Sequence, residues 1–317
     1  MTDKFENNEL SSVLDGWEKN FNSMPPDEAV EIVINDLREI RQNLNMKDWS
    51  SFSTKSCRNH PLISRIHRDP FTKRAYDKPR GYPGDAKLLD YIYSLTDDSL
   101  PVNFDELEED DLKLHRRVNS HPAASSVRER RNILAERLEE TSLSNNDARI
   151  VSIACGHLRE ALNSESIMNG KFGKFTALDM DERSLDVVKD VLTDTGGESE
   201  VIDSPIKNIL NGTVTFKDQD LVYAAGLYDY LQDPVASKLT TMMFEMLRPG
   251  GKVIVANYLP GIPDAGYMEA YMDWWLIYRD KEKMLQLVES GIEGDIEAIT
   301  TFTEPNENII FLEITRK

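Results

Sequence analysis

A glycine and an aspartate, 23 residues apart, are the two positions of this chain best suited to binding a nucleoside. Gly156 follows an apolar run over residues 149–153 and predicts a tight turn that leads into the first turn of a helix. Asp179 ends a second apolar run over residues 174–178. In doubly wound α/β folds, a glycine at the first turn admits a ligand to the backbone, and an acidic residue after the next strand binds ribose hydroxyls. The spacing therefore predicts an adenosine-ribose site.

The turn around Gly156 has fewer glycines than turns that bind dinucleotides. A dinucleotide fingerprint reads Gly-x-Gly-x-x-Gly, whereas this chain has Ala154, Gly156 and Arg159 at those positions. Because a pyrophosphate needs close backbone approach at more than one point, the turn favours a nucleoside without phosphates. An ordinary strand–helix turn is the alternative explanation of Gly156, and a helix cap is that of Asp179.

The element pattern changes near residue 149. Before it, amphipathic helices are predicted over 8–22, 26–44 and 122–140, with an exposed acidic connector over 95–111. After it, one strand begins at 149 and another lies over 174–178, a short strand leads to 202–203, and further strands follow over 221–225 and 252–257. These strands alternate with helices over 181–192, 234–247, 266–279 and 281–290, and strands over 296–302 and 309–315 close the chain. We predict a Rossmann-like, doubly wound, seven-stranded α/β sheet with a C-terminal antiparallel hairpin. We divide the chain into a helical lid or substrate-recognition region, 1–120, and a catalytic domain, 121–317.

Composition narrows the class of protein. The net charge of −19 disfavours binding to nucleic acid or to anionic membranes, and no apolar run reaches the length of a membrane span. The N-terminus has no signal-peptide pattern, and the two cysteines, Cys57 and Cys155, provide no disulfide framework. We expect a cytoplasmic monomer or homodimer that binds no metal and acts on a small molecule.

One segment is basic within this acidic chain. Residues 51–90 contain nine lysines and arginines and four aspartates. The excess of positive charge indicates a pocket for an anionic substrate, or else a solvated face that answers the acidic stretch over 105–111.

Taken together, the positions of Gly156, Asp179, Asp203, the segment LRPGG (247–251) and the closing hairpin resemble the class I S-adenosylmethionine-dependent methyltransferases. A narrower resemblance is to the bacterial 3-hydroxypalmitic acid methyl ester biosynthesis family. It covers about residues 55–317 and rests on RAYDKPRGYPGDAKLLDYIY (74–93), SVRERRNIL (126–134), ACGHLRE (154–160), AGLYDYL (225–231) and YMDWWLIYR (271–279). The resemblance does not extend to residues 1–54.

The resemblance implies S-adenosylmethionine as cofactor, S-adenosylhomocysteine as product, and carboxyl O-methylation of a hydroxy fatty acid. It also implies that Asp203 and Ser204 lie near the adenine, on which Met180 would pack unless it is a core residue. The cofactor-binding residues that we predict are Tyr82, Ala154, Gly156, Asp179, Met180, Asp203, Ser204 and Ala225.

Other candidate residues follow the strands or lie in the basic segment. In RGYPGD (80–85), Tyr82 could approach the sulfonium and Arg80 could pair with a carboxylate, although a structural turn is the alternative. Tyr228 and Asp229 complete the catalytic set with Arg80 and Tyr82, because ligands bind where parallel strands end. The predicted substrate-binding residues are Arg80, Tyr228, Tyr230, Tyr258, Trp274, Tyr278 and Arg279, although aromatics at helical spacing are also typical of a core.

The residues favour a carboxylate acceptor over other acceptors. An ionised carboxylate needs no general base, and none of the five histidines lies in a base constellation. The alternatives are N- or O-methylation of an amino acid or specialised metabolite, a non-catalytic S-adenosylmethionine-binding partner protein, and a nicotinamide oxidoreductase.

Overall fold

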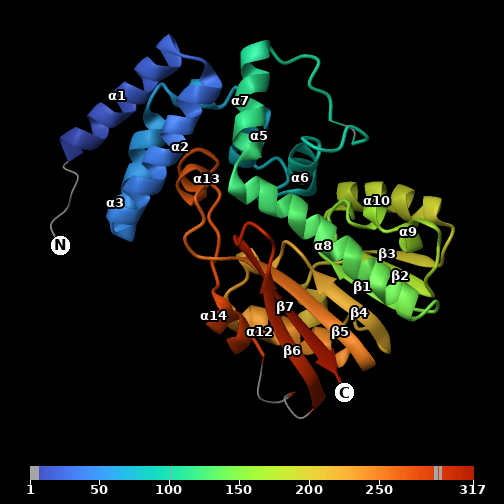
Figure 1. Ribbon diagram of the computed structural model, residues 1–317. Helices are drawn as coiled ribbons and strands as arrows, with labels where there is room; N and C mark the ends of the chain where they lie inside the picture. The colour runs from blue at the N-terminus through green and yellow to red at the C-terminus, as the bar shows by residue number, and fades with distance from the viewer. Residues whose placement is uncertain (1–6, 101, 289–291, 293–294) are drawn as a thin grey trace. The chain divides into compact units, whose positions relative to one another are not determined.

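The chain divides into two compact units. The computed structural model describes residues 7–100, 102–288, 292 and 295–317. The first unit comprises Met1–Ser125 and Gly261–Trp275, and the second comprises Ser126–Pro260 and Leu276–Lys317 (Figure 1). The first unit is therefore built from two stretches of chain, and the shorter one is an excursion that follows the fifth strand of the second unit.

A seven-stranded sheet forms the centre of the second unit. Its strands are β1 Arg149–Ile153, β2 Lys174–Asp179, β3 Ser199–Asp203, β4 Gln219–Ala224, β5 Leu247–Tyr258, β6 Ile296–Thr303 and β7 Ile309–Arg316. The order is β3-β2-β1-β4-β5-β7-β6, in which β1 to β5 pair in parallel and β7 pairs antiparallel with both β5 and β6. The predicted Rossmann-like sheet with a closing hairpin is confirmed. Its order reverses between β1 and β4, which is where ligands bind in such sheets.

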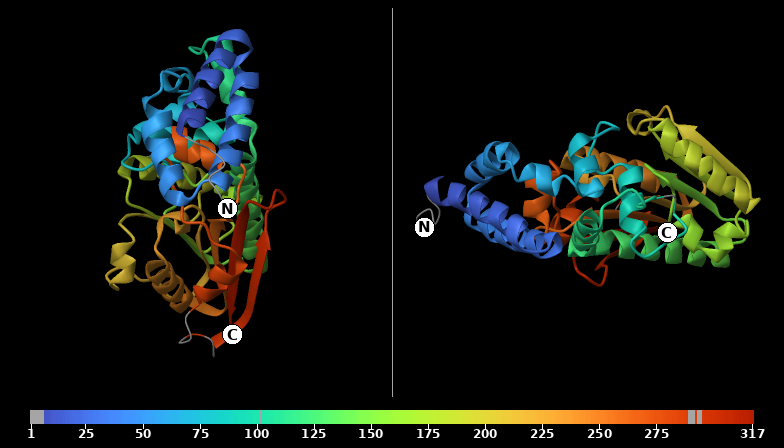
Figure 2. Two further views of the ribbon diagram at one scale, coloured as in Figure 1. Left: turned by 90° about the vertical axis from the view of Figure 1, so that its left-hand side faces the viewer. Right: turned by 90° about the horizontal axis from the view of Figure 1, so that it is seen from above.

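Helices cover both faces of this sheet. They are α8 Pro122–Ser144, α9 Glu165–Met168, α10 Glu182–Thr195, α11 Lys207–Leu210, α12 Asp233–Glu245 and α14 Lys281–Gln286, with short 3-10 turns η3 Ala161–Asn163 and η4 Tyr228–Tyr230. Leu239 and Met243 of α12 share one buried cluster with Val222 of β4 and Val255 of β5. The long helix α8 lies on the opposite face (Figures 1 and 2).

The first unit is helical. Its elements are α1 Asn7–Ser23, α2 Pro26–Asn43, α3 Met46–Ser51, the π-helix η1 Phe52–Ser56, the 3-10 turn η2 Cys57–Asn59, α4 Ile63–Ile66, α5 Pro70–Asp77, α6 Ala86–Tyr93, α7 Glu109–Ser120 and α13 Ala265–Tyr271. The excursion is held here by Glu269, which is buried and accepts hydrogen bonds from Arg41 Nε at 2.7 Å and Trp49 Nε1 at 2.6 Å. Gly266 lets α13 approach α2 closely, since a Cβ there would lie 2.7 Å from the Leu37 carbonyl oxygen.

The helix predicted over 266–279 is wrong beyond Tyr271, where α13 ends. Asp273 adopts a positive φ of 47°, which does not continue a helix. In the second unit, Ile277 donates its N–H to the Asp229 carbonyl and Arg279 donates its N–H to the Tyr258 carbonyl, at 2.8 and 3.0 Å. Trp274, Tyr278 and Arg279 therefore do not share a helical face.

Three other boundaries differ from the predictions. The helix predicted over 281–290 is observed as α14, Lys281–Gln286, and residues 289 and 290 lie outside the described part of the chain. Helix α7 begins inside the stretch predicted as an acidic connector, with Glu109, Asp110 and Asp111 in its first turn, where acids favour the helix dipole. No α-helix follows Gly156 directly: the chain passes through turns and η3 before α9 begins at Glu165.

None of the described helices is both long and apolar enough to cross a membrane.

Candidate functional site: the carboxyl ends of β1, β2 and β4

The turn after β1 has an unusual backbone. Ala154, Gly156 and Leu158 have φ values of 52°, 55° and 52°, so every second residue lies in the left-handed region. Between the first two, Cys155 donates its N–H to the Leu178 carbonyl of β2 at 3.1 Å. This alternation points the Gly156 N–H at the end of β2, where Asp179 Oδ2 accepts it at 2.9 Å. The turn and the strand end thus form one hydrogen-bonded unit.

Asp179 is the acidic group at the centre of this unit. Its Oδ1 accepts the Asp181 N–H at 3.0 Å, so each carboxylate oxygen holds one backbone N–H. A carboxylate has about four acceptor sites, so two remain for a ligand. The residue retains 6% exposure, and its backbone carbonyl is bonded by the Ser204 N–H at 2.9 Å. Such a carboxylate is suited to accept hydrogen bonds from both hydroxyls of a ribose.

Three further predicted residues lie at the same edge. Met180 is 64% exposed, so the structure places this side chain outside the core. Asp203 is exposed at the end of β3 and is in register with Asp179. Ser204 is buried, and its hydroxyl accepts a hydrogen bond from Asn208 Nδ2 at 3.0 Å. An apolar side chain and polar groups therefore flank the Asp179 carboxylate.

A buried acid in this region was missed by the sequence analysis. Glu160 follows the turn and is 8% exposed, and its Oε1 accepts a hydrogen bond from the Tyr223 hydroxyl of β4 at 2.7 Å. Burial raises the pKa of Glu160, although the Tyr223 hydrogen bond and the charges of Arg130 and Arg131 act in the opposite direction. Glu160 links the turn after β1 to β4, across the reversal of strand order.

Arginines of α8 were also missed. Arg130 is 5% exposed and donates from Nη1 to the Ala225 carbonyl at 3.0 Å, just past the end of β4. A Cβ on Gly226 would lie 3.5 Å from its guanidinium. The detectable signal was the run RERR at 128–131, which puts charges at positions where the helix is buried. Arg130 fixes a positive charge at the carboxyl end of β4.

The residues after β4 form a different arrangement. Tyr228 is fully buried, and its hydroxyl shares a hydrogen bond of 2.9 Å with Thr240 Oγ1 of α12. Burial raises the pKa of Tyr228 well above its ordinary value. Asp229 Oδ1 accepts the Tyr258 N–H at 2.7 Å, and burial raises the pKa of Asp229 to about 6. Tyr258 is buried, whereas Tyr230 is half-buried.

Arg279 binds this second arrangement together. It is fully buried, with Nη1 2.7 Å from the Tyr228 carbonyl and 2.7 Å from Asn257 Oδ1. Its Nη2 donates to the Leu231 carbonyl at 2.5 Å and to Asp233 Oδ1 at 2.7 Å. Its donors therefore secure the segment after β4 to the end of β5. Tyr278, next to it, is half-buried.

Arg80, Tyr82 and Trp274 belong to the first unit. Arg80 and Tyr82 are half-buried in the loop between α5 and α6, whose base is closed by the Arg74–Asp85 pair, with Nε–Oδ1 at 3.0 Å and Nη2–Oδ2 at 2.8 Å. Trp274 is 5% exposed and belongs to the excursion. The second unit thus brings together Ala154, Gly156, Asp179, Met180, Asp203 and Ser204, whereas the catalytic and substrate roles predicted for residues outside this set stay predictions.

One cluster in the first unit has the composition of a metal site. Asp15, Glu18 and His60 place ligand atoms within 4.8 Å of one another. However, His60 Nδ1 accepts the Leu62 N–H at 3.2 Å, so a neutral ring carries its proton on Nε2, which faces Asp15 Oδ1 at 3.3 Å. The nitrogen that faces the acids is therefore a donor in this arrangement, which disfavours metal coordination.

Comparison with known proteins identifies the fold. No family model and no curated protein matches the chain. Among solved structures, a possible exported protein from Bordetella parapertussis has a TM-score of 0.56 at 14% identity, over 83% of this chain and 99% of that one. At this identity the similarity shows a shared fold alone.

Two methyltransferases are among the solved structures that match the chain with lower scores. Magnesium protoporphyrin IX methyltransferase from Synechocystis PCC 6803, with bound S-adenosylhomocysteine, has a TM-score of 0.49 at 12% identity, over 78% of this chain and 100% of that one. The N-methyltransferase NodS from Bradyrhizobium japonicum has a TM-score of 0.39 at 13% identity, over 59% of this chain and 96% of that one.

Proposed function

We propose that this protein is an S-adenosylmethionine-dependent methyltransferase, with the cofactor bound at the turn after β1. The observation that carries the proposal is the Asp179 carboxylate. It is held by the N–H groups of Gly156 and Asp181 and keeps acceptor sites for a ribose. The chain after Gly156 does not begin an α-helix, so the turn lacks the helix N-terminus that binds pyrophosphate. This supports a nucleoside over a dinucleotide.

The residues at this edge fit the parts of the cofactor. Asp179 would accept hydrogen bonds from the two ribose hydroxyls, and exposed Met180 would pack on the adenine. Asp203 and Ser204, at the end of the adjacent strand β3, would lie near the adenine amino group. When bound, the cofactor supplies a methyl group on a positively charged sulfur, which is already activated for displacement.

For the acceptor, we propose the carboxylate of a small or fatty hydroxy acid. A carboxylate oxygen attacks the methyl carbon in line as the carbon–sulfur bond breaks, and the electron pair leaves with the sulfur, which gives a methyl ester and a thioether. No proton has to be removed, so no general base is needed. Arg130 supports an anionic acceptor, because its guanidinium places a positive charge at the carboxyl end of β4.

The residues after β4 support the same assignment. The Tyr228 hydroxyl and an Asp229 oxygen are already engaged with Thr240 and with the backbone of Tyr258, and both side chains are buried. We therefore propose a structural role for Tyr228, Asp229 and Arg279, in place of the catalytic and substrate-binding roles first predicted for them.

The reaction is tested with methyl-labelled S-adenosylmethionine and a panel of acceptors: 3-hydroxypalmitate, shorter hydroxy acids, amino acids and phenols. We expect label in base-labile methyl esters of the acids. Label in amines or phenols alone would contradict the carboxylate assignment and favour the amino acid or specialised-metabolite alternative. Tight binding of S-adenosylhomocysteine without turnover on any acceptor would favour a non-catalytic binding protein, and a larger thermal shift with NAD than with S-adenosylmethionine would favour an oxidoreductase.

A further inference from the structure

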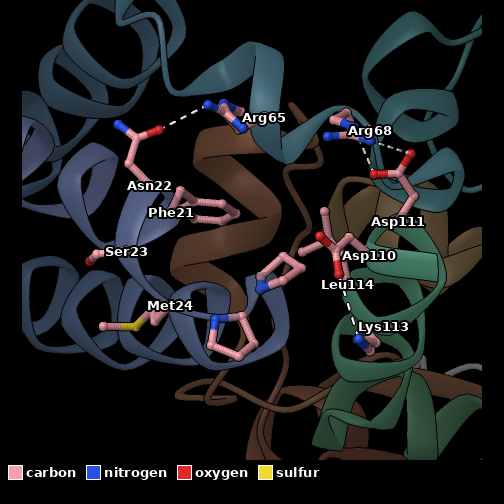
Figure 3. A pocket seen from close by; sticks show the side chains of 12 residues that line it. Phe21, Asn22, Ser23, Met24, Arg65, Arg68, Asp110, Asp111, Lys113 and Leu114 are labelled. Carbon is pink, nitrogen blue, oxygen red and sulfur yellow. Dashed lines mark hydrogen bonds and ion pairs between the residues drawn. The ribbon is translucent and has the colours of Figure 1, made fainter. Parts of the chain in front are cut away.

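The first unit contains a pocket of about 450 Å³ that is separate from the strand-end site of the second unit. It is lined by the end of α1 and the Pro25-Pro26 turn, by Arg65 of α4 and Arg68 just after it, and by the start of α7 (Figure 3). Its volume is within the range of small-molecule sites in proteins. The residues involved come from one unit, so the pocket requires no contribution from the sheet.

One wall of this pocket is apolar. Phe21 of α1, Met24 and Pro25 of the turn that follows, and Pro26 of α2 line it, and buried Leu114 lines it from α7. Figure 3 shows the side chain of Phe21 among the residues that line the pocket. A surface of this kind favours an aliphatic or aromatic group over a wholly polar ligand.

The basic residues of the pocket differ in whether an acidic side chain pairs with them. Arg68 pairs with Asp111, with Nε–Oδ1 at 2.7 Å and Nη2–Oδ2 at 3.0 Å, and Lys113 lies 3.5 Å from Asp110. Arg65 differs, because the partner recorded for it among the described residues is the neutral Asn22, whose Oδ1 accepts from Nη2 at 2.8 Å (Figure 3). Within the described part of the chain, no carboxylate therefore forms an ion pair with the Arg65 guanidinium.

The charge balance selects the ligand. A guanidinium presents several N–H donors in a plane and binds a carboxylate through two of them. Asp110 and Asp111 line the same pocket and would repel a ligand with two negative charges, such as a phosphate monoester. A single negative charge on an apolar body fits both the lone guanidinium and the apolar wall.

We propose that this pocket binds a small amphiphilic monocarboxylate, with its carboxylate on Arg65 and its apolar part against Phe21 and the Pro25-Pro26 turn. The proposal does not depend on the methyltransferase assignment. It gives the basic segment 51–90 a ligand site within the first unit, in addition to any role in catalysis.

The probe is sodium octanoate, and the reporter is the ε-methyl group of Met24 in full-length protein labelled with ¹³C at methionine methyls. Met24→Leu identifies the resonance. We expect a saturable shift of this signal with octanoate, about tenfold weaker affinity or more in Arg65→Gln, and unchanged affinity in Arg38→Gln, which removes the same charge from an exposed position of α2. Octylammonium should leave the Met24 signal unshifted.

Three results would overturn the proposal: no Met24 shift with octanoate, a shift of equal affinity in Arg65→Gln, or an equal shift with octylammonium. Arg65→Lys serves if Arg65→Gln lowers stability, since it keeps the charge and loses the planar fork; intermediate affinity is then expected, and wild-type affinity would contradict bidentate binding. Asp179→Ala separates this site from the strand-end site, because it should leave the Met24 titration unchanged even if the methyltransferase assignment fails.

Discussion

Two segments of the second unit, those after β2 and after β4, each consist of polar residues that follow a buried strand. The two segments differ in the hydrogen bonds that their polar side chains make. After β2, Asp179, which is 6% exposed, is held by two backbone N–H groups, and its carboxylate keeps two acceptor sites. After β4, Tyr228 and Asp229 are buried and bonded to the protein interior, and Arg279 joins that segment to the end of β5. A position at a strand end is therefore not sufficient to make a residue part of a ligand site. The side chain must also keep hydrogen-bonding capacity that the protein interior does not use.

The largest effect is expected where the inward arrangement is broken. Arg279→Met leaves the Tyr228 and Leu231 carbonyls and Asn257 Oδ1 without a buried donor, whereas Asp233 is exposed and can be solvated. The free energy of unfolding should fall by about 3 kcal/mol. Urea unfolding measures this, and the affinity of the folded protein for S-adenosylhomocysteine should stay within about threefold of wild type.

Arg38→Met is the control for Arg279→Met, because it makes the same change on an exposed face of α2 and should leave stability nearly unchanged. A stable Arg279→Met variant that lost cofactor or acceptor binding would contradict the structural role and show that Arg279 belongs to the binding site.

A smaller effect is expected from Asp229→Asn. The raised pKa of Asp229, about 6, means that the native state binds more protons than the unfolded state between about pH 4 and pH 6, so wild-type stability falls as pH rises through that window. Asparagine keeps the acceptor for the Tyr258 N–H and does not titrate. The free energy of unfolding at pH 4 minus that at pH 7 should be smaller in the variant than in wild type by on the order of 2 kcal/mol.

Activity distinguishes this structural role from catalysis. With a carboxylate acceptor, Asp229→Asn should keep kcat within about threefold of wild type. A folded variant with kcat reduced about a hundredfold would show instead that Asp229 acts as a general base.

The smallest effect is expected from His121 in the first unit. Its pH dependence can be measured separately from that of Asp229. Burial alone lowers the pKa of His121, but hydrogen bonds and charges from Asp264 and Glu31 outweigh it and raise the pKa. The stabilisation is fully present below the unfolded pKa of about 6.5 and is lost as pH rises through the folded pKa. His121→Gln should remove a contribution of about 1 kcal/mol or less at pH 6. A variant that was equally destabilised at pH 6 and pH 9 would show that the charge of His121 contributes nothing.

The sequence was informative where local pattern and tertiary structure agree. Apolar runs and the Gly156–Asp179 spacing predicted the sheet and its hairpin, because the burial of a parallel strand is visible in its composition. The role of Arg279 could not be predicted, since it depends on carbonyls at 228 and 231 and on Asn257, which are distant in sequence. Helix α13 was extended too far for a related reason: Asp273 ends the helical geometry with a positive φ, and Arg58 holds its carboxylate at 2.7 Å.

Glu160 and Arg130 were missed because charged residues in buried positions contradict the apolar period used to find a core. Each is stabilised by a partner on β4 or at its end, the Tyr223 hydroxyl and the Ala225 carbonyl. Polar residues that interrupt an apolar helical face, such as those in RERR at 128–131, are therefore informative about a strand-end site when a sheet is already predicted.

The central claim, that Asp179 binds the cofactor ribose, is tested most directly by calorimetric titration of S-adenosylhomocysteine into wild type, Asp179→Ala and Asp194→Ala. The last variant removes the same charge from an exposed position in the final turn of α10. We predict binding by wild type and Asp194→Ala, and affinity weaker by about tenfold or more in Asp179→Ala, because hydrogen bonds to a charged acceptor are lost. Equal affinity in all three proteins would contradict the assignment.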